Sequence, residues 1–180
     1  MSSARPPQPS WSWAAGTDPE ELCVGQTQHV EGHPPGAVLE LVNQFMRTVL
    51  PTDSATVCLL TLDPATGGIR LASAGHPPPL MILNGQPEYL APRGPLLGVR
   101  AQRPPDLEFT LPPGGTLVLY TDGLVERRGA PIDAGLAALS AAAVAEEADL
   151  DHFCERLVVA LGARHGQDDL AVVALRRATG

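Results

Sequence analysis

The chain has 180 residues, enough for one domain with a proper core and too few for two comfortable ones. Hydrophobic residues make up 44% and charged residues 18%, a composition typical of a folded globular chain rather than a disordered one. The formal net charge of −8, without any long run of basic residues, argues against a surface for nucleic acid or anionic membrane.

No stretch approaches the roughly 18 apolar residues of a membrane span, and the N-terminal residues lack the apolar centre of a secretion signal. The three cysteines, Cys23, Cys58 and Cys154, are widely separated and form no C-x-x-C pair. We therefore expect a cytoplasmic protein with reduced thiols.

Residues 1–31 show no clear period, which predicts a poorly ordered leader before one domain over residues 32–180. Apolar residues then recur three and four positions apart over residues 36–49, the pattern of one helix face. Pro51 ends this predicted helix.

Three hairpins follow in the predicted chain order. Their strands are 55–62 with 69–74, 80–83 with 88–90 around the turn Asn84-Gly85, and 107–111 with 116–120 around PPGG. Helices are predicted over 133–147 and 150–162, and a last buried strand over 171–175. This order of elements predicts an α+β fold with mostly antiparallel pairing.

The segment LVLYTDGLVERRG places Asp122 directly after a strand that reads as fully buried. A buried carboxylate without a partner is costly, so a metal ion, a ring of backbone amides or exposure at the strand end must compensate it. Asp168 and Asp169 stand in the same way just before the last strand. If the two strands are neighbours, the carboxylates converge and favour Mg²⁺ or Mn²⁺. The alternative is that aspartate and glycine only cap strand ends.

His76 follows a strand and a glycine in SAGHP, within reach of a phosphate or a bound water. The alternative for a single loop histidine is a structural hydrogen bond. The sequence contains no HExxH, P-loop, GxGxxG or GxSxG motif. A serine triad is therefore a poor hypothesis.

These stretches together resemble the PPM-type, or type 2C, metal-dependent serine/threonine phosphatases of the bacterial SpoIIE/RsbU-like branch. The matching segments stand in the family's order and cover about residues 32–177: ATVCLLTLDPATGGIRLASAGHPPPLMI, GPLLGV, LVLYTDGLVERR and GQDDLAVVALRR. The resemblance implies a layered αββα sandwich of mostly antiparallel sheets, of which this chain corresponds to the C-terminal two-thirds.

In that family two of the matching aspartates hold Mn²⁺ or Mg²⁺, and water activated by the ions attacks the phosphoserine phosphorus. The resemblance carries the ligand roles to Asp122 and Asp168, and less directly to Asp169. Gly123, which would let the chain turn sharply, and His76 are expected near the site. No residue is assigned a catalytic role.

The family also carries an upstream GDWYD-type strand, whose aspartate bridges two metal ions, and a D-x-x-GHG element. Neither occurs here, and Asp18 and the GHP of residues 32–34 are not assigned as ligands. The resemblance thus leaves two functions open. One is metal-dependent dephosphorylation of a signalling protein such as an anti-sigma factor antagonist. The other is an inactive pseudophosphatase that binds anti-sigma or anti-anti-sigma partners. A gene remnant or an incorrect start codon is a third reading, and the oligomeric state is open.

Overall fold

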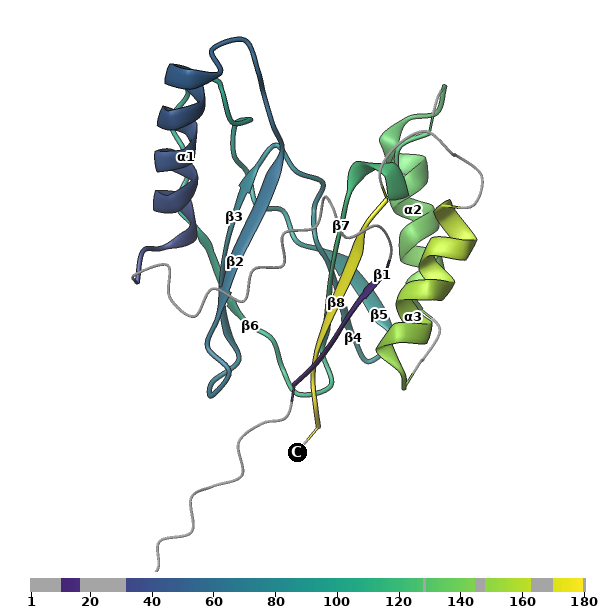
Figure 1. Cartoon of the computed structure of the whole chain (residues 1–180). Coiled ribbons are helices and arrows are strands. Elements are labelled where there is room, and N and C mark those ends of the chain that lie inside the picture. The colour runs from purple at the N-terminus through teal and green to yellow at the C-terminus, as the bar shows by residue number, and fades with distance from the viewer. Residues whose placement is uncertain (1–10, 17–31, 128, 145–147, 163–169, 180) are drawn as a thin grey trace, which may run out of the picture.

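Two β-sheets pack face to face between helices in the computed structural model of this protein (Figure 1). The structure describes residues 11–16, 32–127, 129–144, 148–162 and 170–179. The five-stranded sheet has the order β1-β8-β7-β4-β5: Trp11–Gly16, Val172–Arg177, Thr116–Tyr120, Leu80–Leu83 and Gln86–Tyr89. The three-stranded sheet has the order β2-β3-β6: Val57–Leu62, Gly68–Ala74 and Leu107–Thr110. All strand pairs are antiparallel.

Helices cover the outer face of each sheet. Helix α1 (Pro35–Val49) packs on β2 and β3, while α2 (Ile132–Ala143) and α3 (Leu150–Leu157) cover the five-stranded sheet. A π-helical turn, η2 (Val158–Gly162), continues α3. This is the predicted αββα arrangement, and the fold class is confirmed.

The alternation of side chains along β7 shows how the core forms. Leu117 points between the sheets, where it packs with Ile69 and Leu71, whereas Val118 and Tyr120 point toward α2 and α3. Successive residues of a strand face opposite sides, so a strand buried on both faces reads as an unbroken apolar run. The segment LVLY is such a strand.

The predicted hairpin of residues 107–111 and 116–120 is wrong. Although both strands form, β6 pairs with β3 and β7 pairs with β4 and β8, so the PPGG segment crosses between the sheets. Leu111 continues the β6 direction by donating its amide to the Gly67 carbonyl. Two apolar strands around a turn therefore did not reveal which sheet each one joins. The other two predicted hairpins are present as β2–β3 and β4–β5.

Strand β1 was not predicted, because no residue pattern before residue 32 indicates a helix or strand. Trp11–Gly16 pairs antiparallel with β8, with Trp11 opposite Arg177 and Gly16 opposite Val172. Six residues of Trp, Ser, Ala and Gly carry little local signal, and their conformation depends on the exposed edge of β8. The remaining leader residues, 1–10 and 17–31, lie outside the described part.

Helix α1 matches its prediction. Pro35 opens the helix, the Gly36 amide donates to Asp106 Oδ1 at 2.9 Å, and the helix ends at Val49, before Pro51. Helix α2 ends at Ala143, and residues 145–147 lie outside the described part. In the described residues every helix is too short or too polar to cross a bilayer.

Stability is expected to fall as pH rises above about 9, because Cys58 is packed between the sheets. Burial raises the pKa of its thiol from 9.0 to about 12. The unfolded chain loses this proton first, so stability is complete below pH 9 and is lost as pH rises toward 12. Urea unfolding at several pH values should show a shallower loss above pH 9 for Cys58→Ala than for the parent chain. Equal slopes would contradict this assignment.

Candidate functional site

Asp122 lies at the end of β7, on the 3₁₀ turn η1 (Asp122–Leu124). The turn is held in place by Leu124 and Val125, which are buried in the hydrophobic core against α2 and α3. The Asp122 carbonyl accepts from the amides of Val125 and Glu126, which extends the turn by one helical step. The aspartate therefore stands on a rigid base.

Asp122 is exposed to solvent, so its carboxylate does not pay the desolvation free energy of a buried charge. Its Oδ1 accepts one hydrogen bond, from the Gly123 amide at 2.9 Å, and no ion pair reaches it within the described part of the chain. Solvent and the Gly123 amide thus stabilise the negative charge of this carboxylate, and no further group is needed. Gly123 is buried in the 3₁₀ turn, and its φ is not positive. The turn at this position therefore does not use the left-handed backbone conformation that favours glycine.

His76 lies near Asp122, because the turn after β3 is held against the end of β7. Burial lowers the pKa of the His76 imidazole, while the Tyr120 carbonyl and the charge of Asp122 act in the opposite direction. The His76 amide donates to Ser73 Oγ at 3.3 Å, and its buried Nδ1 has no hydrogen-bond partner. The imidazole therefore lies near the aspartate and keeps one buried ring nitrogen without a partner.

Tyr120 is the positioning residue that sequence reasoning missed. Its hydroxyl donates to the Pro78 carbonyl at 2.7 Å and ties the His76 loop to β7, two residues before Asp122. The side chain is 2% exposed. An aromatic residue in an apolar strand gives no sequence signal for this contact, which depends on the pairing of β4 with β7.

Replacing Tyr120 by phenylalanine is expected to cost about 1–2 kcal/mol of unfolding free energy, because it leaves the Pro78 carbonyl without its donor. Urea unfolding measures this loss. Thr116→Val is the matched control, since it deletes a buried hydroxyl at the other end of β7, where Thr116 Oγ1 accepts from Arg176 Nε at 2.8 Å. Both variants should lose stability, but only Tyr120→Phe should also alter phosphate-ester hydrolysis. Equal effects on hydrolysis would contradict the positioning role.

Asp168 and Asp169 lie outside the described residues, so the predicted convergence with Asp122 stays a prediction. The described chain resumes at Leu170, and here β7 and β8 are tied together. The Ala171 amide donates to Thr121 Oγ1 at 2.9 Å, and the Thr121 amide donates to the Ala171 carbonyl at 3.0 Å. The strands on which the prediction rests are neighbours in the sheet.

Two exposed carboxylates on and beside the η1 turn have donor chemistry that suits a divalent metal ion. Asp122 offers a free, exposed carboxylate oxygen, the ligand type that Mg²⁺ and Mn²⁺ prefer. Glu126, one helical turn further on, is exposed as well, a spacing readable in the sequence as DGLVE. No group of three His, Cys, Asp or Glu side chains that could hold an ion occurs in the described ranges. The donor chemistry fits, and a complete set would need ligands from beyond them.

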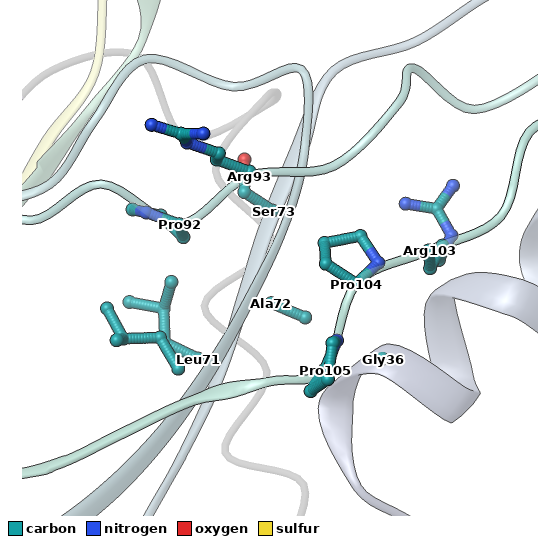
Figure 2. Close-up of a pocket in the computed structure, with 10 residues that line it drawn as sticks. Gly36, Leu71, Ala72, Ser73, Pro92, Arg93, Arg103, Pro104 and Pro105 are labelled. Atoms are coloured by element: carbon teal, nitrogen blue, oxygen red, sulfur yellow. The ribbon is translucent and has the colours of Figure 1, made fainter.

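A small hollow lies elsewhere, between the start of α1, β3 and the proline-rich segment before β6 (Figure 2). Its volume of about 10 Å³ suits at most one water molecule. The guanidinium groups of Arg93 and Arg103 lie apart in Figure 2, and Arg103 Nε is 3.7 Å from Glu40 Oε2. Asp122 does not line this hollow, which reads as a packing defect beside a buried arginine rather than as the reactive site.

Two mostly antiparallel sheets between helices, with an exposed aspartate at the end of a central strand, define the class of PPM-type phosphatase folds. The family model for Stage II sporulation protein E (SpoIIE) matches residues 24–178. The chain belongs to this SpoIIE family and to its RsbU-like branch of PPM-type proteins.

Three solved structures illustrate the similarity. The RsbU and RsbW domains of a Mycobacterium tuberculosis protein share 32% identity and a TM-score of 0.69 over 82% of this chain. The PP2C phosphatase domain with a regulatory fragment of SpoIIE from Bacillus subtilis shares 18% identity and 0.63 over 77%. RsbX in complex with magnesium shares 17% and 0.61 over 79%. The chain spans 43%, 42% and 64% of these structures, less than two thirds of each.

Proposed function

We propose that this protein dephosphorylates phosphoserine or phosphothreonine in a cytoplasmic signalling protein, such as an anti-sigma factor antagonist, with Mn²⁺ or Mg²⁺. The observation that carries the proposal is the exposed carboxylate of Asp122 at the end of β7, beside the first residues of β8. The Asp168-Asp169 pair directly precedes β8 in the sequence. Membership of the SpoIIE family and the resemblance to RsbU-type domains support the reaction class and the kind of partner.

The family resemblance gives the residues their roles in this proposal. Asp122, Asp168 and Asp169 would supply carboxylate oxygens to the ion, which lowers the pKa of water and neutralises phosphoryl oxygens. Water adds to phosphorus, the serine oxygen leaves as the alcohol, and inorganic phosphate is the other product. His76, whose imidazole senses the charge of Asp122, would lie beside the ion and the water. No covalent enzyme intermediate is needed.

The exposure of Asp122 favours a protein substrate. A carboxylate on a surface turn is open to a phosphorylated side chain carried on another folded protein, whereas a small metabolite is normally held in a deeper pocket. We therefore expect specificity to come from contacts between protein surfaces around the turn.

The test uses the full chain freed of metal with a chelator. Hydrolysis of p-nitrophenyl phosphate and of a phosphoserine-containing anti-sigma antagonist should appear on addition of Mn²⁺ or Mg²⁺ and disappear on its removal. Turnover that is unaffected by chelator would contradict the metal requirement, and metal-saturated protein without turnover would contradict the activity.

A second function, that of a partner-binding pseudophosphatase, is favoured by one observation. The 180 residues contain neither a GDWYD-type segment nor a D-x-x-GHG element, so the carboxylate that bridges two ions in the family has no counterpart among them. Calorimetry showing Mn²⁺ binding of millimolar affinity or weaker, together with tight binding of an anti-sigma or anti-anti-sigma protein, would favour this function. Robust turnover would exclude it.

A further inference from the structure

The chain that follows β5 leaves the five-stranded sheet at the same end as the η1 turn. β4 lies between β7 and β5 in the sheet and pairs antiparallel with both. Tyr89 and Val118 both lie opposite Leu80, the first residue of β4. The chain after β5 and the turn that carries Asp122 therefore emerge on either side of the loop that contains His76.

Arg93 belongs to this chain and is held against the end of β3. The Gly75 amide donates to the carbonyl of Gly94, the next residue after Arg93, at 3.0 Å. A Cβ on Gly94 would overlap the Ser73 carbonyl, so the two segments touch through their backbones. Gly75 directly precedes His76. The backbone at Arg93 is thus fixed beside the His76 loop.

The same segment is held a second time a few residues further on. Leu97 and Ala55 exchange backbone hydrogen bonds at 3.0 and 3.4 Å. The Leu96 side chain lies where a Cβ on Gly75 would stand, and so packs over the start of the His76 loop. With the backbone held on its C-terminal side in this way, the Arg93 side chain projects from an ordered segment.

Arg93 is connected to Asp122 through a short series of contacts. Arg93 and Ser73 line the same small hollow, and Figure 2 shows the Arg93 side chain extending away from α1. The His76 amide donates to Ser73 Oγ at 3.3 Å, and the charge of Asp122 acts on the His76 imidazole. Arg93 therefore lies in the surroundings of the candidate site.

Arg93 carries a positive charge that no described residue neutralises. It is exposed, and the ion pairs among the described residues do not include it. Residues 90–105 contain three arginines and no acidic residue, in a chain whose net charge is −8. The next acidic residue, Asp106, is bound to the start of α1, and the Arg103 side chain is buried. The charge of Arg93 is left to act on a group outside the chain.

We propose that Arg93 selects phosphoprotein substrates by pairing with an aspartate or glutamate that lies a few residues from the phosphoserine. The inference rests on the proposed phosphatase function and names the substrate class for that site. The η1 turn and its neighbour present two exposed carboxylates, Asp122 and Glu126, which repel an acidic segment unless a positive charge offsets them. A residue two or three positions from the phosphoserine is about 7–11 Å away in an extended segment, so a separate anchor beside the site suits it.

The first test measures binding, which does not require turnover. Fluorescence anisotropy compares two labelled phosphoserine peptides with the full chain in Mn²⁺, one with aspartates flanking the phosphoserine and one with asparagines. The parent chain should bind the acidic peptide about two- to fivefold more tightly, the range for an exposed ion pair, and high salt should abolish this preference. Arg93→Gln should bind the two peptides with equal affinity. Because Arg93 is exposed, this variant retains the fold.

Arg70→Gln is the matched control. It removes the same charge from an exposed arginine on β3, where Arg70 Nε is 3.1 Å from Glu108 Oε1, and it should keep the preference of the parent chain. A preference for the acidic peptide that persists in Arg93→Gln would overturn the proposal. So would an equal loss of preference in both variants.

The second test measures hydrolysis. The ratio of kcat/KM for the acidic phosphopeptide to that for p-nitrophenyl phosphate should fall in Arg93→Gln by the same factor as the binding preference, because the ester has no flanking residue. An unchanged ratio would overturn the proposal, since Arg93 would then act on the phosphoryl group or not at all. If neither substrate is hydrolysed by any of the proteins, the proposed phosphatase function fails, and the binding preference alone still decides the role of Arg93.

Discussion

Asp122→Asn is expected to lower metal-dependent phosphate-ester hydrolysis by more than about 100-fold. Even partners that only orient metal ligands cost 10–100-fold when mutated, and Asp122 is proposed as a ligand itself. Asparagine keeps an oxygen for the Gly123 amide but loses the negative charge. Because the side chain is exposed, the unfolding free energy should change by less than about 0.5 kcal/mol. Steady-state hydrolysis across a Mn²⁺ titration, together with urea unfolding, measures both quantities.

Asp53→Asn provides the control, since it makes the same change at another exposed aspartate, outside the η1 turn. Its activity should equal that of the parent chain. Full activity of Asp122→Asn would remove the central residue from the proposed site. Equal losses in both variants would point to a general effect of charge instead.

Gly135→Ala is expected to destabilise the protein by about 3 kcal/mol or more, the upper end of overpacking costs. Gly135 is buried in α2, and a Cβ there would stand 2.9 Å from Val125 Cα and overlap the Val125 carbonyl oxygen. Neither atom can move away by changing a rotamer. Val125 directly follows η1, so relieving the overlap means moving α2 away or displacing the turn that carries Asp122. Thermal and urea unfolding should show the loss, and hydrolysis should decline with it.

The higher helix propensity of alanine partly offsets this destabilisation. Alanine is favoured over glycine by about 1 kcal/mol inside a helix, and Ala137→Gly, at an exposed position of α2, calibrates that contribution. A Gly135→Ala protein as stable as the parent chain would show that α2 does not press on the turn.

Much of the fold was readable from residue patterns. The 3.6-residue period and flanking prolines located α1, and the DPATGG and Asn84-Gly85 turns located the β2–β3 and β4–β5 hairpins. Family motifs then supplied the layered architecture. The pairing of β6 and β7 was misjudged, because a short turn-forming loop looks the same whether it joins two strands of one sheet or crosses between two sheets.

Some features of the candidate site were likewise predictable from the sequence, and others were not. The sequence marked Asp122 as a polar residue at a strand end and placed His76 after β3, and both positions are where the motifs put them. The tether from Tyr120 to Pro78, the contact of Gly135 with Val125 and the exposure of Asp122 depend on how distant strands and helices pack.

By itself, the sequence determined the family, the order of most elements and the identity of the carboxylates proposed as ligands, because these depend on local periodicity and on motifs along the chain. Only the tertiary structure decided which sheet each strand joins, that β1 pairs with β8, and that one flank of α1 stays exposed. The physical reason is that strand pairing and burial depend on contacts between residues far apart in the chain, which no local pattern encodes.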